Sequence, residues 1–113
     1  MKHAPLIRVV RSQTKPKVEK EYLKWLHDTH IPMLLESKLL KGVATYKLIP
    51  ETKSPEYYEY MLIFEFDNQE GCEAYQSSPE RAAAVAESET HDWHGLHTVQ
   101  QKVQYKLVKS WKR

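Results

Sequence analysis

The chain has 113 residues, the size of a single domain, with a net charge of +2 and interleaved acidic and basic residues. This pattern argues against nucleic-acid and membrane partners, because surfaces that bind either one concentrate basic residues in a patch. Cys72 is the single cysteine and no apolar run is long enough for a membrane span or a signal peptide, so we expect one cytoplasmic domain over residues 1–113.

The first half of the chain predicts a strand, a long helix and a second strand. Residues 6–11 (LIRVVR) are short and β-branched, which is typical of a strand, and a turn rich in helix breakers follows. Residues 17–37 show helical periodicity. Gly42 then opens the second predicted strand, residues 42–49 (GVATYKLI).

The second half repeats the alternation of strand and helix. We predict a strand over residues 57–66, a helix over 69–76, its continuation from Pro79, and a last strand over 99–111. Asp67 with Glu70 three residues later resembles a capping box, and Ser78 before Pro79 is typical of a second helix start. The basic residues of the last strand, Lys102 among them, are expected on a solvated face.

The order β-α-β-β-α-β predicts an α+β, ferredoxin-like fold, with a four-stranded antiparallel sheet and both helices on one face. Such a sheet should alternate apolar and polar residues, yet the strand over 57–66 carries aromatic and aliphatic side chains on both sides. Leaving such side chains in water forgoes about 1.5–3 kcal/mol each. We therefore predict a homodimer packed sheet to sheet, a dimeric α+β barrel. The alternative is a monomer whose tyrosines extend their hydroxyls to water.

Two histidines of the long helix are expected to face different surroundings. At 100° per residue, His30 falls inside the apolar arc and His27 falls at its edge. Pro32 removes a backbone donor and clashes one turn back, so we expect the helix to break near residues 29–31. Such a break would let His30 face a pocket.

A family resemblance rests on these residues. The pattern Tyr22-x-x-Trp25-x-x-x-x-His30-x-Pro32, followed by Gly42 opening a strand, resembles the EthD family of dimeric α+β barrels. Residues 74–87 (AYQSSPERAAAVAE) are similar to the helix of that family that carries a Ser-Pro-Glu break, so the resemblance spans residues 6–87. It implies a pocket between helices and sheet in each protomer, with His30 as the family histidine. The superfamily includes polyketide cyclases, isomerases, decarboxylases and monooxygenases without cofactors.

The chemistry expected at such a pocket is acid–base catalysis, with no cofactor and no metal. The ordinary pKa of histidine is near 6.5, so His30 has both forms available at neutral pH, and the Tyr60 hydroxyl is a weaker candidate for stabilising an enolate. A flat aromatic or polyketide-type ligand is expected to contact Tyr22, Trp25, Tyr46, Met61 and Phe64. The alternative for His30 is a core histidine bonded to a main-chain carbonyl that the break releases.

Two other functions stay open at this point. One is a non-catalytic ligand-binding or stress-responsive protein of the same fold. The other is a metal-binding protein that uses His91, His94 and His97, since three imidazoles suit a divalent ion. Gly95 disfavours a helix there, so the segment is alternatively a solvated loop that Trp93 pins to the core.

Overall fold

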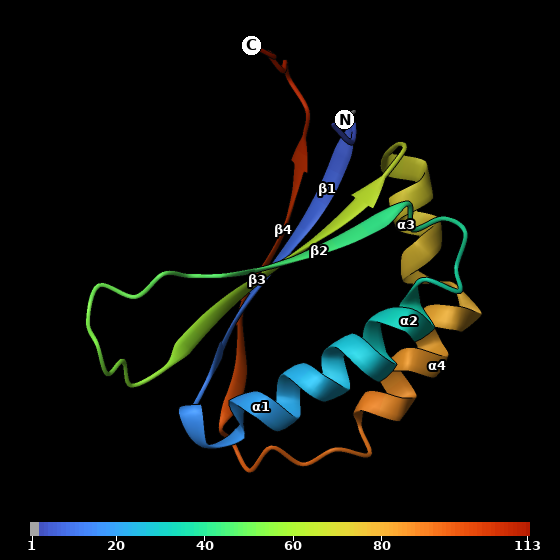
Figure 1. Cartoon of the computed structure of the whole chain (residues 1–113). Helices are drawn as coiled ribbons and strands as arrows, with labels where there is room; N and C mark the ends of the chain where they lie inside the picture. The colour runs from blue at the N-terminus through green and yellow to red at the C-terminus, as the bar shows by residue number, and fades with distance from the viewer. Residues whose placement is uncertain (1–2) are drawn as a thin grey trace.

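The computed structural model describes residues 3–113 as one twisted sheet with the helices on one side (Figure 1). The sheet is antiparallel, with the order β2-β3-β1-β4. The elements are β1 (Leu6–Thr14), α1 (Pro16–Trp25), η1 (Leu26–His30), α2 (Ile31–Leu34), β2 (Gly42–Lys47), β3 (Tyr58–Phe66), α3 (Gln69–Gln76), α4 (Pro79–Ser88) and β4 (His97–Lys106). The predicted order of strands and helices and the ferredoxin-like fold are confirmed.

The first helix does not break at its proline, so that prediction is wrong. The chain passes from α1 into the π-helical turn η1 and on into α2, and Ile31 keeps helical angles of φ −62° and ψ −46°. The Ile31 N–H donates to the carbonyl of Leu26, five residues back. A turn widened by one residue accommodates a proline, because Pro32 offers no N–H and its ring needs space beside the Asp28 carbonyl.

The second helical segment has the predicted bounds and one cap that differs. Ser78 caps α4 with its hydroxyl, which accepts a hydrogen bond from the Arg81 N–H at 3.2 Å. The cap of α3 is Asn68, whose Oδ1 accepts from the Gly71 N–H at 2.7 Å, so the expected cap at Asp67 is wrong. Asp67 instead forms an ion pair with Lys41 at 3.7 Å.

Strand β1 is longer than predicted and β4 ends earlier, because pairing with the neighbouring strands decides where each strand ends. β1 lies between β3 and β4, so its backbone groups are paired on both sides through Thr14, although the segment there is polar. β4 is an edge strand that pairs with β1 alone. The last backbone hydrogen bond between the two segments is the one that the Leu107 N–H donates to the Pro5 carbonyl at 2.8 Å. The residues after Leu107 lie beyond the first residue of β1, so β4 has no neighbouring strand there and ends.

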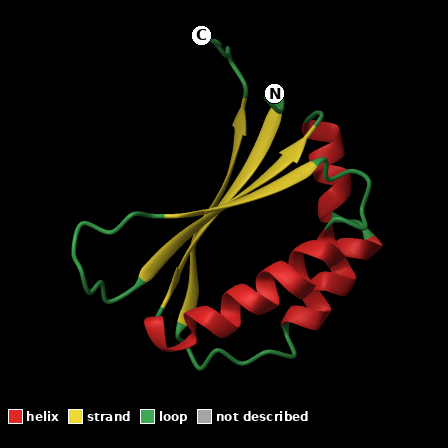
Figure 2. Cartoon of the chain, viewed as in Figure 1, coloured by secondary structure: helices red, strands yellow, loops and turns green. Residues whose placement is uncertain are grey.

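The core lies between the sheet and the helices (Figure 2). Leu26 and Phe66 are almost fully buried there, and Cys72 and Ala84 of the helices have no exposed surface. No helix within residues 3–113 is long and apolar enough to cross a membrane.

The other face of the sheet carries no helix (Figure 2) and is largely apolar at its centre. The strand register places one apolar row across all four strands, formed by Ala44, Ile63, Val9 and Val103. Tyr46 and Tyr105, on the same side of the sheet, are more than half exposed, at 55% and 56%. Both faces of the sheet therefore carry large apolar side chains, as the sequence predicted.

Candidate functional site

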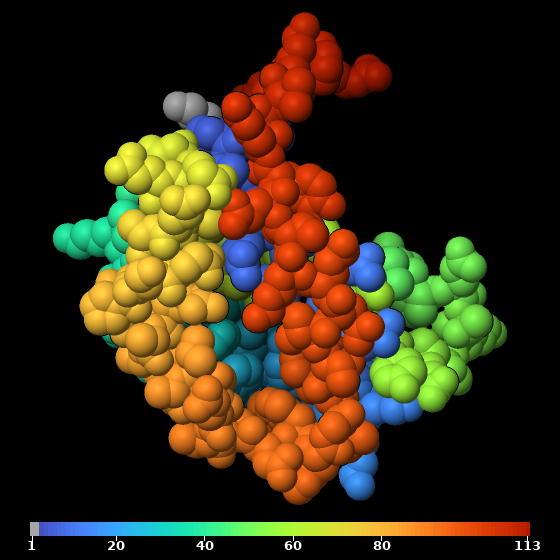
Figure 3. All heavy atoms as spheres, turned by 180° about the vertical axis from the view of Figure 1, so that it is seen from behind, coloured from blue at the N-terminus to red at the C-terminus, as the bar shows by residue number. Residues whose placement is uncertain are grey.

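A cavity of about 390 Å³ lies between the helices and the sheet. Figure 3 shows the hollow between α4 and β4, with the first helix behind it. Cavities of this size typically hold a small organic molecule. Much of the wall is apolar and includes Leu26, Leu34, Leu62 and Phe64.

His30 lines the cavity, as its place on the apolar arc predicted, whereas His27 is exposed. The His30 ring stacks on Trp25, with 4.7 Å between ring centroids and 24° between planes. Its Nδ1 is buried and has no hydrogen-bond partner within residues 3–113. Burial lowers the pKa of His30, with Glu87 raising it and Arg81 lowering it further. The imidazole is therefore neutral at pH 7, in the form that accepts a proton.

The predicted alternative for His30, a bond to a main-chain carbonyl released by a helix break, is not what the structure shows for Nδ1. The helix is continuous, and the Leu26 carbonyl is occupied by the Ile31 N–H.

A hydrogen-bonded chain fixes the indole against which His30 stacks. Trp25 Nε1 donates to Glu87 Oε1 at 2.8 Å, and the other carboxylate oxygen of Glu87 lies 2.8 Å from His91 Nε2. The bond from Trp25 and then the bond from His91 lower the pKa of Glu87, so its carboxylate stays ionised. Glu87 thus holds the Trp25 ring, and through it the orientation of His30.

A second stacked pair closes the same end of the cavity. The ring of His97 lies on Tyr22 with 4.1 Å between centroids, and His97 Nδ1 is 2.9 Å from Thr14 Oγ1. Burial lowers the pKa of His97 to about 4. Burial also raises the pKa of Tyr22 to about 12, which the nearby Ser12 hydroxyl opposes.

The lowered pKa of His97 predicts that part of the free energy of unfolding is lost in acid. Its pKa is about 4 in the folded chain and near 6.5 when unfolded, so the unfolded state binds the proton first as the pH falls. Stability is therefore complete above about pH 6.5 and lost between there and about pH 4, by about 1–2 kcal/mol once the partial solvent contact of the ring is allowed for.

Urea unfolding of the wild type and of His97→Gln at about pH 7.5 and about pH 4.5 measures this component. The wild type is expected to lose more free energy of unfolding than the variant between the two pH values. His94→Gln is the control, because His94 is exposed and contacts Asp92 at the surface. Equal losses in wild type and His97→Gln would contradict the prediction.

Of the residues expected to contact a ligand, Tyr22, Trp25 and Phe64 line the cavity, together with His30. Tyr46 and Met61 pair across β2 and β3 and point to the opposite face, because side chains alternate along a strand.

Tyr60 does not line the cavity either, although it faces the helices and is buried. Its hydroxyl donates to Glu19, which also pairs with Lys47 at 2.9 Å. Burial and this hydrogen bond raise the pKa of Tyr60.

Sequence reasoning did not find the polar end of the cavity. Arg8, Tyr75, Arg81 and Lys102 line it, and Lys102 is at the same time exposed to solvent, as expected for the last strand. Arg8 carried a usable signal: it alternates with Leu6 and Val10 and so falls on the helix-facing side of its strand. Trp93 packs against the core as expected for the loop before β4.

The three histidines of the predicted metal site have separate partners. His91 is bonded to Glu87, His94 lies 3.2 Å from Asp92, and His97 contacts Thr14. Within residues 3–113 no group of three or more His, Cys, Asp or Glu side chains is arranged to hold a metal ion. The structure therefore does not assemble the metal site proposed as an alternative.

Several solved structures are similar in fold. An EthD family protein from Bacillus halodurans has a TM-score of 0.65 at 12% identity, covering 91% of this chain and 99% of its own. SnoaB from Streptomyces nogalater, a cofactor-independent oxygenase, has a TM-score of 0.60 at 9% identity, covering 97% and 100%. A dimeric ferredoxin-like protein of unknown function from Thermobifida fusca has a TM-score of 0.53 at 19% identity, covering 95% of each chain.

Identities this low establish a shared fold, the ferredoxin-like fold, and no more. Among curated proteins, none matches the chain in sequence. The model of a domain of unknown function, DUF4286, matches residues 6–102, nearly the whole folded region. The chain therefore belongs to the DUF4286 family and has the ferredoxin-like fold that its resemblance to EthD proteins predicted.

Proposed function

We propose that this protein is a homodimeric, small-molecule-binding α+β barrel that performs acid–base chemistry on an aromatic or polyketide-type compound without a cofactor. The observation that carries the proposal is the buried Nδ1 of His30 in the cavity wall, which has no hydrogen-bond partner among residues 3–113. Buried polar atoms in proteins are nearly always hydrogen-bonded. A ligand polar group is the partner that this site lacks.

The geometry supports proton transfer next to a carbonyl. Neutral His30 accepts a proton from the carbon beside the ligand carbonyl, which leaves an enolate, and returns the proton at another position. Return of the proton to another carbon gives isomerisation. Attack of the enolate on a second carbonyl forms the ring bond and an alkoxide, and transfer of the proton from His30 to that oxygen completes cyclisation. Trp25, held by Glu87, fixes the plane of the imidazole. SnoaB, which shares the fold, is a cofactor-independent oxygenase, so this fold is compatible with catalysis that needs no cofactor.

The apolar row on the open sheet face supports a homodimer. A second copy packed on this face would remove from water the partly exposed Ile63 and the exposed rings of Tyr46 and Tyr105. The dimeric ferredoxin-like protein from Thermobifida fusca shares the fold. Each protomer would keep its own cavity, because the cavity lies on the helix side of the sheet. We place the protein in the cytoplasm, where the buried thiol of Cys72 would stay reduced.

A crystal structure of untagged protein, purified without added ligand, tests the proposal. We expect two copies packed sheet to sheet and density for a flat molecule beside Trp25, with a polar atom within hydrogen-bond distance of His30 Nδ1. A collapsed cavity, with Nδ1 of His30 bonded to a main-chain carbonyl, would remove the basis for a ligand.

A further inference from the structure

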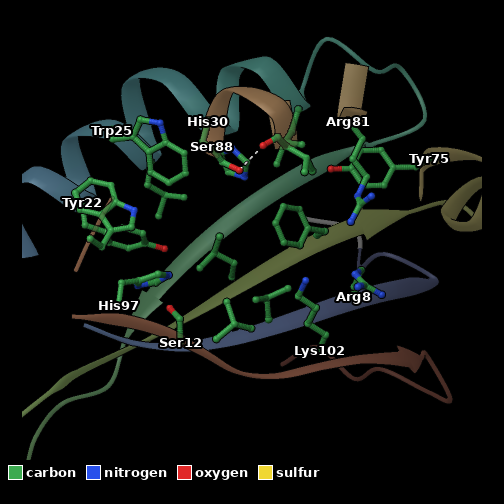
Figure 4. A pocket seen from close by; sticks show the side chains of 18 residues that line it. Arg8, Ser12, Tyr22, Trp25, His30, Tyr75, Arg81, Ser88, His97 and Lys102 are labelled. Atoms are coloured by element: carbon green, nitrogen blue, oxygen red, sulfur yellow. Dashed lines mark hydrogen bonds between the residues drawn. The ribbon is translucent and has the colours of Figure 1, made fainter. Parts of the chain in front are cut away.

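Three cationic side chains from three elements meet at one end of the cavity. Arg8 extends from β1, Arg81 from α4 and Lys102 from β4, and Figure 4 shows all three directed toward the same space. The opposite end is aromatic, with Tyr22, Trp25 and Trp93. The cavity therefore has a charged end and an aromatic end.

The position of Arg8 is costly unless its charge has a partner. It lies on the helix-facing side of a central strand, opposite Phe64 of β3, and is half-buried. Arginine in such a place is normally paired with a carboxylate, since taking an unpaired charge out of water costs several kcal/mol.

No carboxylate supplies that pairing inside the cavity. The side chains that line it include no aspartate or glutamate, and Arg8, Arg81 and Lys102 form no ion pair within residues 3–113. Arg81 donates to the Gln76 carbonyl at 3.3 Å, a neutral partner.

A few lysines of the surface lie beside carboxylates. Lys15 lies 2.9 Å from Glu56, and Lys47 lies 2.9 Å from Glu19. What sets the cavity apart is burial: Arg8 and Arg81 are half-buried without a carboxylate partner within residues 3–113, whereas Lys102 is exposed to solvent at the rim.

Tyr75 adds a neutral donor at the same end. Its side chain is buried, and burial raises its pKa to about 12, while the charges of Arg81 and then Arg8 act in the opposite direction. Both guanidinium groups are therefore close enough to the phenol to influence it, and the phenol keeps its proton at neutral pH.

We propose that this end of the cavity binds an oxyanion group, a carboxylate or a phosphate, carried by a ligand whose aromatic body lies toward Trp25 and Trp93. This proposal rests on the proposed function. It makes the ligand class more specific, because the ligand would be an aromatic acid and not an apolar aromatic molecule. Arginine forks bind carboxylate and phosphate oxygens in pairs, and charge-assisted hydrogen bonds are about twice as strong as neutral ones. The oxyanion anchors the ligand while its aromatic part reaches His30.

Three probes that share one naphthalene body test the charge requirement, and the carboxylate and the amide among them are also nearly equal in shape. We measure dissociation constants of 2-naphthoate, 2-naphthyl phosphate and neutral 2-naphthamide by quenching of Trp25 and Trp93 fluorescence. Trp111→Phe is the background, because Trp111 lies in the exposed tail. At least one of the two anions is expected to bind about tenfold or more tightly than the amide, and the tighter one identifies the group.

Variants that remove one positive charge each then show which side chains bind the anionic group. Arg8→Gln and Arg81→Gln are each expected to weaken anion binding about five- to tenfold and leave the amide unchanged, and Arg81→Lys recovers part of the loss. Lys24→Gln is the control with the same charge change, because Lys24 is exposed on α1 away from the cavity. Circular dichroism confirms that each variant is folded.

The outcomes separate the two proposals. Equal affinities for all three probes, unaffected by the arginine variants, would overturn the oxyanion subsite and leave the aromatic cavity in place. No binding of any probe by the folded wild type would overturn the cavity as a ligand site and the subsite with it.

Discussion

Replacing Ile63 with glutamate is expected to convert the proposed dimer, of twice the 13.4 kDa chain mass, into a folded monomer at micromolar concentration. Ile63 lies in the apolar row of the open sheet face, opposite Val9 of the central strand. In a symmetric dimer the variant places two carboxylates in the interface, each without a partner. Burying them costs roughly 3 kcal/mol or more, which weakens association at least about 100-fold.

Sedimentation equilibrium measures the change. Ala83→Glu is the matched control, since Ala83 is exposed on α4 and the charge change is the same. Circular dichroism decides whether the Ile63→Glu chain is folded, and Tyr46→Lys, at the exposed flank of the face, is a milder second variant. A wild type that sediments as a well-folded 13.4 kDa species would contradict the homodimer directly.

Apolar side chains beyond the sheet point to the same conclusion. Leu48 and Ile49 follow β2 and are 59% and 88% exposed, while Val108 and Trp111 of the tail are 96% and 75% exposed. Both segments extend away from the body of the chain (Figure 1). A second copy on the sheet face would lie between these segments and would give their apolar side chains a surface to cover.

The fold was predictable from the sequence because local signals agreed with the global arrangement. The strand over residues 57–66 and the helix start at Ser78 are each marked by several adjacent residues. Strand ends were less predictable, because pairing with neighbours decides them: β1 continues through Ser12 and Thr14 since two strands flank it. The π turn before Pro32 was missed because a proline signals a disruption without saying whether the helix breaks or widens.

The site was predictable only in part, for a different physical reason. His30, Trp25 and Tyr22 share one helix, so periodicity alone orients them. Arg8 and Lys102 come together with Arg81 only when the sheet and α4 pack, and no spacing in the sequence encodes that distance. Their cationic end changes the expected ligand from apolar to acidic, which the aromatic residues alone did not suggest.

Replacing His30 with alanine is expected to abolish catalysed proton exchange while the cavity still binds its ligand. The probe is 2-tetralone, an aromatic ketone whose protons beside the carbonyl exchange with deuterium in D2O, as followed by proton NMR. A positioned general base contributes about 10²–10⁴-fold, so the protein-dependent exchange rate should fall by at least about 100-fold. His27→Ala is the control, because His27 is exposed on the same helix and bonds to Thr45.

The pH dependence of the same exchange separates catalysis by His30 from a merely structural effect. Burial lowers the pKa of His30 below its ordinary value near 6.5, and only the neutral ring accepts a proton. The protein-dependent rate should therefore rise with pH through a midpoint below 6.5, level off at neutral pH, and lose this dependence in His30→Ala. A wild type that binds 2-tetralone without accelerating its exchange over buffer would favour the non-catalytic binding protein, and an unchanged rate in His30→Ala would assign the proton transfer to another group.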